Sequence, residues 1–166
     1  MTRIATVGVI SDTHGLLRPG LLELFKGVDA IIHAGDIGSP GVLEALRKIA
    51  PVHAVRGNVD TGDWAAALPL FDLFEIAGRF VYLTHDLKTI DLDPAAAGIQ
   101  VVISGHSHVP GFTHKSGVLY LNPGSAGPKR FKLPISAALL RFESDGGIKA
   151  EIREFRDDRK VSRRLF

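Results

Sequence analysis

The chain has 166 residues, of which 45% are hydrophobic and 23% are charged. This length and composition are typical of one soluble globular domain, so we expect a single domain over residues 1–166. The sequence contains no cysteine, which excludes disulfide bonds and thiolate ligands. Any metal ion must therefore be held by Asp, Asn and His side chains.

The formal net charge is +2, and much of the basic excess lies near the C-terminus. We interpret residues 156–166 as a basic, solvated tail, because aromatic residues are not interleaved with the charges as in a nucleic-acid groove. A nucleic-acid partner is therefore not expected. No apolar run approaches the roughly 18 residues of a membrane span, and no signal-peptide core precedes the first strand. We expect a cytoplasmic protein with no membrane partner.

The first third of the chain alternates between strands and helices. Apolar runs rich in β-branched residues predict buried strands at residues 4–10, 28–33 and 52–55. Pro19 is well placed to begin one helix, and Ser39 to cap a second helix that begins at Pro40. Such repeated strand, loop and helix units predict a parallel sheet whose strand ends open at the same edge.

The rest of the chain changes character. Residues 70–76 and 79–83 predict a hairpin, Pro94 to Gly98 a short helix, and residues 101–103 another buried strand. Antiparallel strands are expected after this point, at residues 111–114, 118–121, 135–142 and 148–155. The sequence therefore favours an α/β domain with two packed sheets.

Polar side chains that suit a metal ion follow these apolar runs. Asp12 and His14 share one loop, and Asp36 follows a glycine, with a helix cap as its alternative role. Asn58 offers a neutral oxygen, although Gly57-Asn58 is also a common turn. The remaining donors are three histidines, His85, His106 and His108.

The Asp12 and His14 pair, Asn58 and His85 are weak signals alone, since a turn or a structural histidine is the common alternative. Asp36 is a stronger signal, and Gly105-His106-Ser107-His108 is the most specific single motif. His106 and His108 would point apart in an extended strand, so either a loop lets both serve one site or they serve two adjacent ions. Because the strand ends should converge, we expect the seven residues to form a centre for two metal ions bridged by Asp36.

The ordered set of motifs resembles the calcineurin-like metallophosphoesterases, most closely their small bacterial and archaeal phosphodiesterase branch. The resemblance covers residues 4 to about 140 and includes Asn122-Pro123-Gly124-Ser125. It implies a two-sheet mixed β-sandwich flanked by α-helices. It also implies that one ion is held by Asp12, His14, Asp36 and His108, and the other by Asp36, Asn58, His85 and His106.

The resemblance further implies hydrolysis of a small phosphoester, most often a phosphodiester, by in-line attack of a metal-bridging hydroxide. Asp36 and Asn58 are then catalytic residues as well as ligands. We expect Mn²⁺, with Zn²⁺, Fe, Co²⁺ and Ni²⁺ as alternatives that the same ligands accept.

Two positions depart from the family pattern. Val59 stands where many relatives have a histidine that protonates the leaving group, so low-pKa leaving groups should be favoured unless His33 or a metal-bound water supplies the proton. A buried, hydrogen-bonded strand-end residue is the equal alternative for His33. Asp86 follows His85 where relatives usually have glycine, which bears on the geometry of the second ion.

Substrate contacts are less well defined. Asn58, Asn122 and Arg130 are the candidates, although a plain turn and a solvated loop charge are alternatives for Asn122 and Arg130. Trp64 and Phe71 are expected in the core, with a substrate wall as the alternative. Competing functions are a phosphomonoesterase acting on a nucleotide or small metabolite, and a non-catalytic scaffold like the retromer subunit of this fold. The apolar strands of the C-terminal half permit a homo-oligomer.

Overall fold

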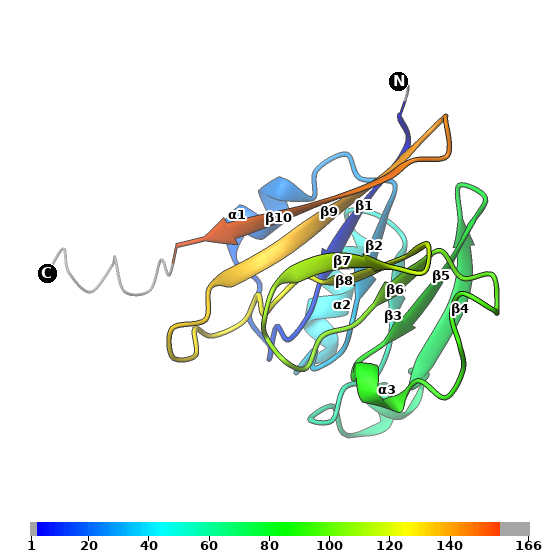
Figure 1. The fold of residues 1–166 in the computed structure, drawn as a ribbon. Coiled ribbons are helices and arrows are strands. Elements are labelled where there is room, and N and C mark those ends of the chain that lie inside the picture. The colour runs from blue at the N-terminus through cyan, green and yellow to red at the C-terminus, as the bar shows by residue number, and fades with distance from the viewer. Residues whose placement is uncertain (1–2, 157–166) are drawn as a thin grey trace, which may run out of the picture.

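The computed structural model describes residues 3–156, which form two five-stranded sheets that lie face to face (Figure 1). The first sheet has the order β10-β9-β1-β2-β3, in which β1, β2 and β3 are parallel and β9 is antiparallel to both of its neighbours. Its strands are β1 (Arg3–Ile10), β2 (Ala30–His33), β3 (Val52–Ala54), β9 (Ile135–Glu143) and β10 (Ile148–Phe155).

The second sheet has the order β4-β5-β6-β8-β7. Strands β5, β6 and β8 are parallel, while β4 and β7 are antiparallel edge strands. The strands are β4 (Phe71–Ile76), β5 (Arg79–Thr84), β6 (Val101–Ile103), β7 (Gly111–Lys115) and β8 (Val118–Asn122).

Helices α1 (Pro19–Leu24) and α2 (Pro40–Arg47) pack on the outer face of the first sheet. Gly8 of β1 permits this approach, because a β-carbon there would lie 2.7 Å from the ring of Phe25. A short helix α3 (Asp63–Ala66) and a 3₁₀-helix η1 (Leu87–Thr89) complete the elements of the described chain.

The main core lies between the two sheets and is built from the inward-facing residues of their central strands. Both sheets contribute side chains that are almost inaccessible to solvent, among them Val7, Val9, Ile32, Val81, Leu83, Ile103, Leu121 and Leu140. The expected two-sheet mixed sandwich flanked by helices is therefore confirmed. Because the strand order is fixed by this shared core, the loops after the parallel strands are held in fixed positions.

Some local expectations were wrong. Strand β8 pairs in parallel with β6, where only antiparallel strands were expected beyond residue 103. Pro94 to Gly98 form hydrogen-bonded turns and no helix. Ser39 occupies the N-cap position of α2, but its side chain makes no capping hydrogen bond.

Among residues 3–156, none of the helices is both long and apolar enough to cross a membrane. Apart from Arg156, the predicted basic tail lies outside the described residues.

Candidate metal centre

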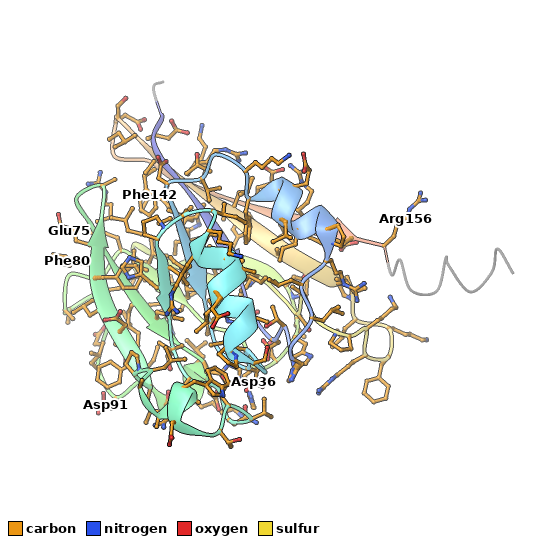
Figure 2. The ribbon with its side chains drawn as sticks, turned by 180° about the vertical axis from the view of Figure 1, so that it is seen from behind. Asp36, Glu75, Phe80, Asp91, Phe142 and Arg156 are labelled. Atoms are coloured by element: carbon orange, nitrogen blue, oxygen red, sulfur yellow. The ribbon has the colours of Figure 1, made fainter. Side chains whose placement is uncertain are left out.

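The candidate ligands gather at one edge of the sandwich, where the parallel strands of both sheets end. In the first sheet, Asp12 and His14 follow β1, Asp36 follows β2 and Asn58 follows β3. In the second sheet, His85 follows β5, and His106 and His108 follow β6. Figure 2 shows Asp36 at this edge, close to the start of α2. The structure thus brings together the residues expected from the sequence.

The first ligand group consists of Asp12, His14 and His108, whose donor atoms lie within 4.8 Å of one another. The Asp12 Oδ1 and His108 Nε2 atoms are 3.1 Å apart. Asp12 Oδ1 and His14 Nε2 are buried and have no hydrogen-bond partner among the described residues. Because buried polar atoms are normally satisfied, these two suit a cation as their missing partner.

The second ligand group contains His85, Asp36 and Asn58. The Nδ1 atom of His85 lies 2.7 Å from the Ala34 carbonyl oxygen, to which it donates its hydrogen. The other ring nitrogen, Nε2, lies 2.9 Å from Asn58 Oδ1 and 3.3 Å from Asp36 Oδ2. When the His85 ring is neutral, its Nε2 atom carries no hydrogen, so Nε2, Asn58 Oδ1 and Asp36 Oδ2 are three electron-rich atoms that face one another. A proton or a metal ion between these atoms is needed to stabilise that arrangement.

The pKa values at this group reflect the same arrangement. Burial alone would lower the pKa of His85, but hydrogen bonds to Asp36 and the Ala34 carbonyl outweigh it and leave the pKa raised. Burial would raise the pKa of Asp36, yet hydrogen bonds from His85 and the Val59 N–H lower it to about 2. The site therefore holds a carboxylate and attracts positive charge.

The two ligand groups are adjacent and share residues. Asp12 is part of the first group and also has a carboxylate oxygen within 4.8 Å of the donor atoms of Asp36 and His85 in the second. Asp36 Oδ2 is 3.9 Å from His14 Nε2 and 3.3 Å from His85 Nε2, so this carboxylate reaches both groups. Burial lowers the pKa of His14 in spite of the nearby carboxylates, and the neutral ring is the form that binds metal.

His106 completes the second group, since its Nδ1 atom lies 3.3 Å from Asn58 Oδ1. His106 and His108 lie in a loop, and His108 belongs to the first group while His106 lies beside the second. Asp86, which follows His85, does not keep the His85 ring from the second ligand group. It begins the 3₁₀-helix η1, where its Oδ1 accepts a hydrogen bond from the Lys88 N–H, and its Oδ2 lies 3.9 Å from His106 Nε2.

The backbone is left-handed at most of the candidate ligands. The φ values are 56° at Asp12, 47° at His14, 54° at Asp36, 68° at His106 and 62° at His108. Side chains rarely adopt this conformation, which costs on the order of 1–3 kcal/mol per residue. Among the described non-glycine residues, only Ala77, Ser116 and Phe131 share it. Backbone strain is thus concentrated at the ligands.

Two glycines allow the ligand loops to approach one another. A β-carbon at Gly57 would overlap the backbone nitrogen and Oδ1 of Asp36, and one at Gly105 would overlap the Ser11 hydroxyl oxygen. The Ser11 hydroxyl itself donates a hydrogen bond to Asp12 Oδ2 at 2.6 Å. Glycine at these positions therefore lets the loop of Asn58 approach Asp36 and the loop of the two histidines approach Asp12.

Asp60 is a functional support that the sequence analysis missed. Its buried carboxylate accepts hydrogen bonds from the backbone N–H groups of Ile37, Gly38 and Gly57, at 3.1, 2.9 and 2.9 Å. These bonds join the loop that carries Asp36 to the loop that carries Asn58. Asp60 lies two residues after Asn58, but its sequence position alone did not indicate that it binds the backbone.

His33 is fully buried and uses both ring nitrogens within the protein. The Gly35 N–H donates to Nδ1 at 3.1 Å, so Nε2 carries the hydrogen and donates it to the Thr13 hydroxyl oxygen at 3.0 Å. Burial lowers the pKa of His33 to about 4. A neutral imidazole is too weak an acid to protonate a leaving group, and the hydrogen on Nε2 is already donated to Thr13. This geometry supports the structural role that the sequence left open and argues against the catalytic one.

The substrate candidates occupy different positions. Asn122 holds the histidine loop, because its amide nitrogen donates to the Gly105 carbonyl and the Ser107 hydroxyl, each at 3.0 Å. Arg130 is exposed, and its positive charge helps to lower the pKa of His14. Trp64 packs against the core beneath the helices, as expected, but Phe71 is 59% exposed, so a core role for Phe71 is wrong.

The fold and the ligand groups define an α/β sandwich with a metal-binding edge, and comparison with known proteins gives its family. A model of the calcineurin-like phosphoesterase superfamily domain matches residues 6–145. The chain therefore belongs to the calcineurin-like phosphoesterase superfamily.

Individual relatives agree with this assignment. A probable metallophosphoesterase of Methanothermobacter thermautotrophicus is 34% identical over 151 residues, which cover 84% of this chain and 87% of the relative. A phosphodiesterase of Methanocaldococcus jannaschii is 31% identical over 137 residues, or 71% of this chain and 82% of the relative. The solved structure of Vacuolar Protein Sorting 29 from Cryptosporidium parvum has a TM-score of 0.73 at 20% identity and covers 93% of this chain and 99% of that chain.

Proposed function

We propose that this protein is a phosphodiesterase that uses two divalent metal ions, with Mn²⁺ as the first candidate. The observation that carries the proposal is the convergence of two adjacent ligand groups, the first of which contains two buried donor atoms without a hydrogen-bond partner, Asp12 Oδ1 and His14 Nε2. In the proposed assignment, Asp12, His14, Asp36 and His108 hold one ion, and Asp36, Asn58, His85 and His106 hold the other. Asp, Asn and His donors suit Mn²⁺ and also accept Zn²⁺, Fe, Co²⁺ or Ni²⁺.

When bound, two such ions activate water for in-line attack on phosphorus and offset the charge on the phosphoryl oxygens. The protein fixes the positions of the metal ligands. The Val59 N–H holds Asp36 Oδ1 at 3.0 Å, and the Ala34 carbonyl holds the His85 ring, so both ligands are oriented in advance. Asn58 is exposed beside them and is the residue proposed to contact the substrate phosphate as well.

Among the described residues, neither of the two positions considered for the general acid supplies a proton to the leaving group. Val59 is 46% exposed next to Asn58 and has no titratable side chain, and His33 is enclosed. We therefore expect the rate to depend steeply on the pKa of the leaving group. Comparing p-nitrophenyl and alkyl esters of the same phosphate measures this slope, and similar rates on both would reveal an acid elsewhere in the site.

A diester is favoured over a monoester as substrate because a relative more than 30% identical is a phosphodiesterase. A phosphomonoesterase acting on a nucleotide or a small metabolite is the second candidate, since the metal ligands themselves select only the phosphoryl group. The likeness to Vacuolar Protein Sorting 29 supports a scaffold in fold alone, and the ligand groups favour catalysis.

The deciding experiment is hydrolysis of bis(p-nitrophenyl) phosphate by metal-stripped protein as Mn²⁺ is added back, with p-nitrophenyl phosphate run alongside. We expect metal-dependent turnover, faster on the diester. Asp36→Asn should abolish it, because this carboxylate reaches both groups, whereas the exposed Asp91 can be replaced by Asn without loss.

The alternatives give different results in the same assay. Faster turnover of the monoester would establish the phosphomonoesterase. Absence of turnover with every candidate metal would overturn the catalytic proposal and favour the scaffold, and full activity of metal-stripped protein would exclude the metal mechanism.

A further inference from the structure

A cavity of about 380 Å³ adjoins the second ligand group, a size within the range of roughly 300–1,000 Å³ found for small-molecule sites. Asn58, His85 and His106 line one side of it. A phosphate ester bound at these ligands therefore has space beside it for the group that the ester carries.

The opposite wall of the cavity is apolar and exposed. Leu70 and Phe71 line it and are 60% and 59% exposed, although side chains of this kind are normally buried. The Phe71 ring is held in place by Tyr82, which is buried and stacks on it with ring centroids 5.7 Å apart and planes at 10°. Phe71 is thus a positioned aromatic surface, fixed by its neighbour and still accessible.

A cationic side chain lines the same cavity. Arg56 is half-buried there, and its guanidinium makes no hydrogen bond or ion pair with any residue of the described chain. The Asp86 carboxylate also lines the cavity, but it is engaged by the Lys88 N–H and faces His106. Arg56 is therefore available to attract an anionic ester.

We propose that this cavity binds the aromatic group of a nucleoside-type phosphate ester, with Phe71 as the stacking surface and Arg56 as the attracting charge. The inference rests on the proposed function, because the ligand groups must hold the phosphate. It extends that function to a substrate class, since planar bases stack well on a phenyl ring whose other contacts are already formed.

The test compares two ligands that differ only in the base. Binding of adenosine 5′-monophosphate and of ribose 5-phosphate to the Mn²⁺-loaded protein is measured by calorimetry. We expect adenosine 5′-monophosphate to bind roughly tenfold more tightly, as found when one base stacks on one aromatic side chain.

Variants separate stacking from charge. Phe71→Ala should remove the preference for the base and leave ribose 5-phosphate unchanged, while Phe71→Tyr should restore it. Arg56→Gln should weaken both ligands by similar factors. Phe80 is the matched control, because it is also an exposed phenylalanine of the β4–β5 hairpin, 45% exposed, but lies away from Asp36 (Figure 2) and outside the cavity. Phe80→Ala should bind both ligands as the unmodified protein does.

The outcomes distinguish the two levels of the proposal. Equal binding of the two ligands, or a preference that survives Phe71→Ala, would overturn the nucleoside inference while the metal-dependent hydrolysis of bis(p-nitrophenyl) phosphate stands. Failure of both ligands to bind, together with absence of that hydrolysis, would overturn the inference and the proposed function alike.

Discussion

His33 shows how a polar residue can support the candidate metal centre without being one of its expected ligands. It lies at the end of β2 and connects the Gly35 N–H to the Thr13 hydroxyl, which in turn donates to the Ile37 carbonyl at 2.8 Å. This chain of hydrogen bonds joins the loops that carry the first two aspartates. The histidine therefore contributes to the site through the positions of its neighbours.

The enclosure of His33 predicts a pH dependence of stability. Its pKa falls from 6.5 to about 4 on folding, so the unfolded state binds more protons between these values. The contribution of His33 to the free energy of unfolding is about 3 kcal/mol in total. This contribution is complete above pH 6.5 and is lost as the pH falls to about 4.

Urea denaturation of the unmodified protein and of His33→Gln, carried out across this pH range, isolates the effect. The difference in unfolding free energy should shrink as the solution is acidified. Parallel stability curves would show that His33 titrates normally in the native state.

Asp60 carries a second prediction. Asp60→Ala leaves the N–H groups of Ile37, Gly38 and Gly57 without their acceptor. Ile37 and Gly57 are buried, so each of their unsatisfied N–H groups costs about 1–3 kcal/mol, whereas the N–H of the exposed Gly38 can bond to water. We expect a loss of about 3 kcal/mol or more of unfolding free energy and weaker metal binding, measured by urea denaturation and calorimetry. Asp145, which accepts one exposed hydrogen bond from Gly147, is the control, since Asp145→Asn should change neither quantity appreciably.

At the scale of elements, the close approach of the loops after β2 and β3 depends on the absence of one side chain. Gly57→Ala would push its new methyl group into the backbone and carboxylate of Asp36 and should separate the two loops. We expect lower stability by more than about 1 kcal/mol and a clear loss of metal affinity. Gly111→Ala introduces the same methyl into open space and should be almost neutral in both thermal unfolding and metal titration.

The sequence predicted the elements that depend on local pattern and missed those decided by distant partners. The strands that precede Asp12 and Asp36 are continuous apolar runs, so their type and the convergence of their ends followed from the residues themselves. The parallel pairing of β8 with β6 depends on contacts between distant segments of the chain, which the local sequence of residues 118–122 does not specify.

The candidate site shows the same division. Its ligands could be expected because each follows an apolar strand, whereas the role of Asp60 depends on backbone groups of a different loop. Phe71 was expected inside because it is aromatic. It lies on the edge strand β4, whose residues alternate between exposed and half-buried, and Phe71 is at one of the exposed positions.

At the scale of the whole molecule, the two sheets meet at a site that strains the backbone at five ligands, and metal binding should stabilise the fold. Binding at a concentration of about 100 times Kd adds about 2.7 kcal/mol, which for a domain of this size raises Tm by roughly 5–10 °C.

Differential scanning calorimetry with Mn²⁺ and with a chelator measures the shift. The His85→Ala variant should lose most of the Tm shift caused by Mn²⁺. The His114→Ala variant, changed in the exposed strand β7, should keep this shift. An unchanged Tm with Mn²⁺ in the unmodified protein would argue against a metal centre at this edge.

The place of β1 has a consequence for how the molecule is made. Val7 is paired with Ala30 on one side and with Leu140 on the other, so the strand that leads to Asp12 has one neighbour from the early chain and one from the late chain. While the polypeptide is being synthesised, the apolar edge of β1 stays open until β9 emerges from the ribosome. That interval exposes a strand prone to pairing with other nascent chains. A chaperone that shields this edge would act before β1 is paired on both sides, and therefore before the loop that carries Asp12 reaches its final position in the candidate metal centre.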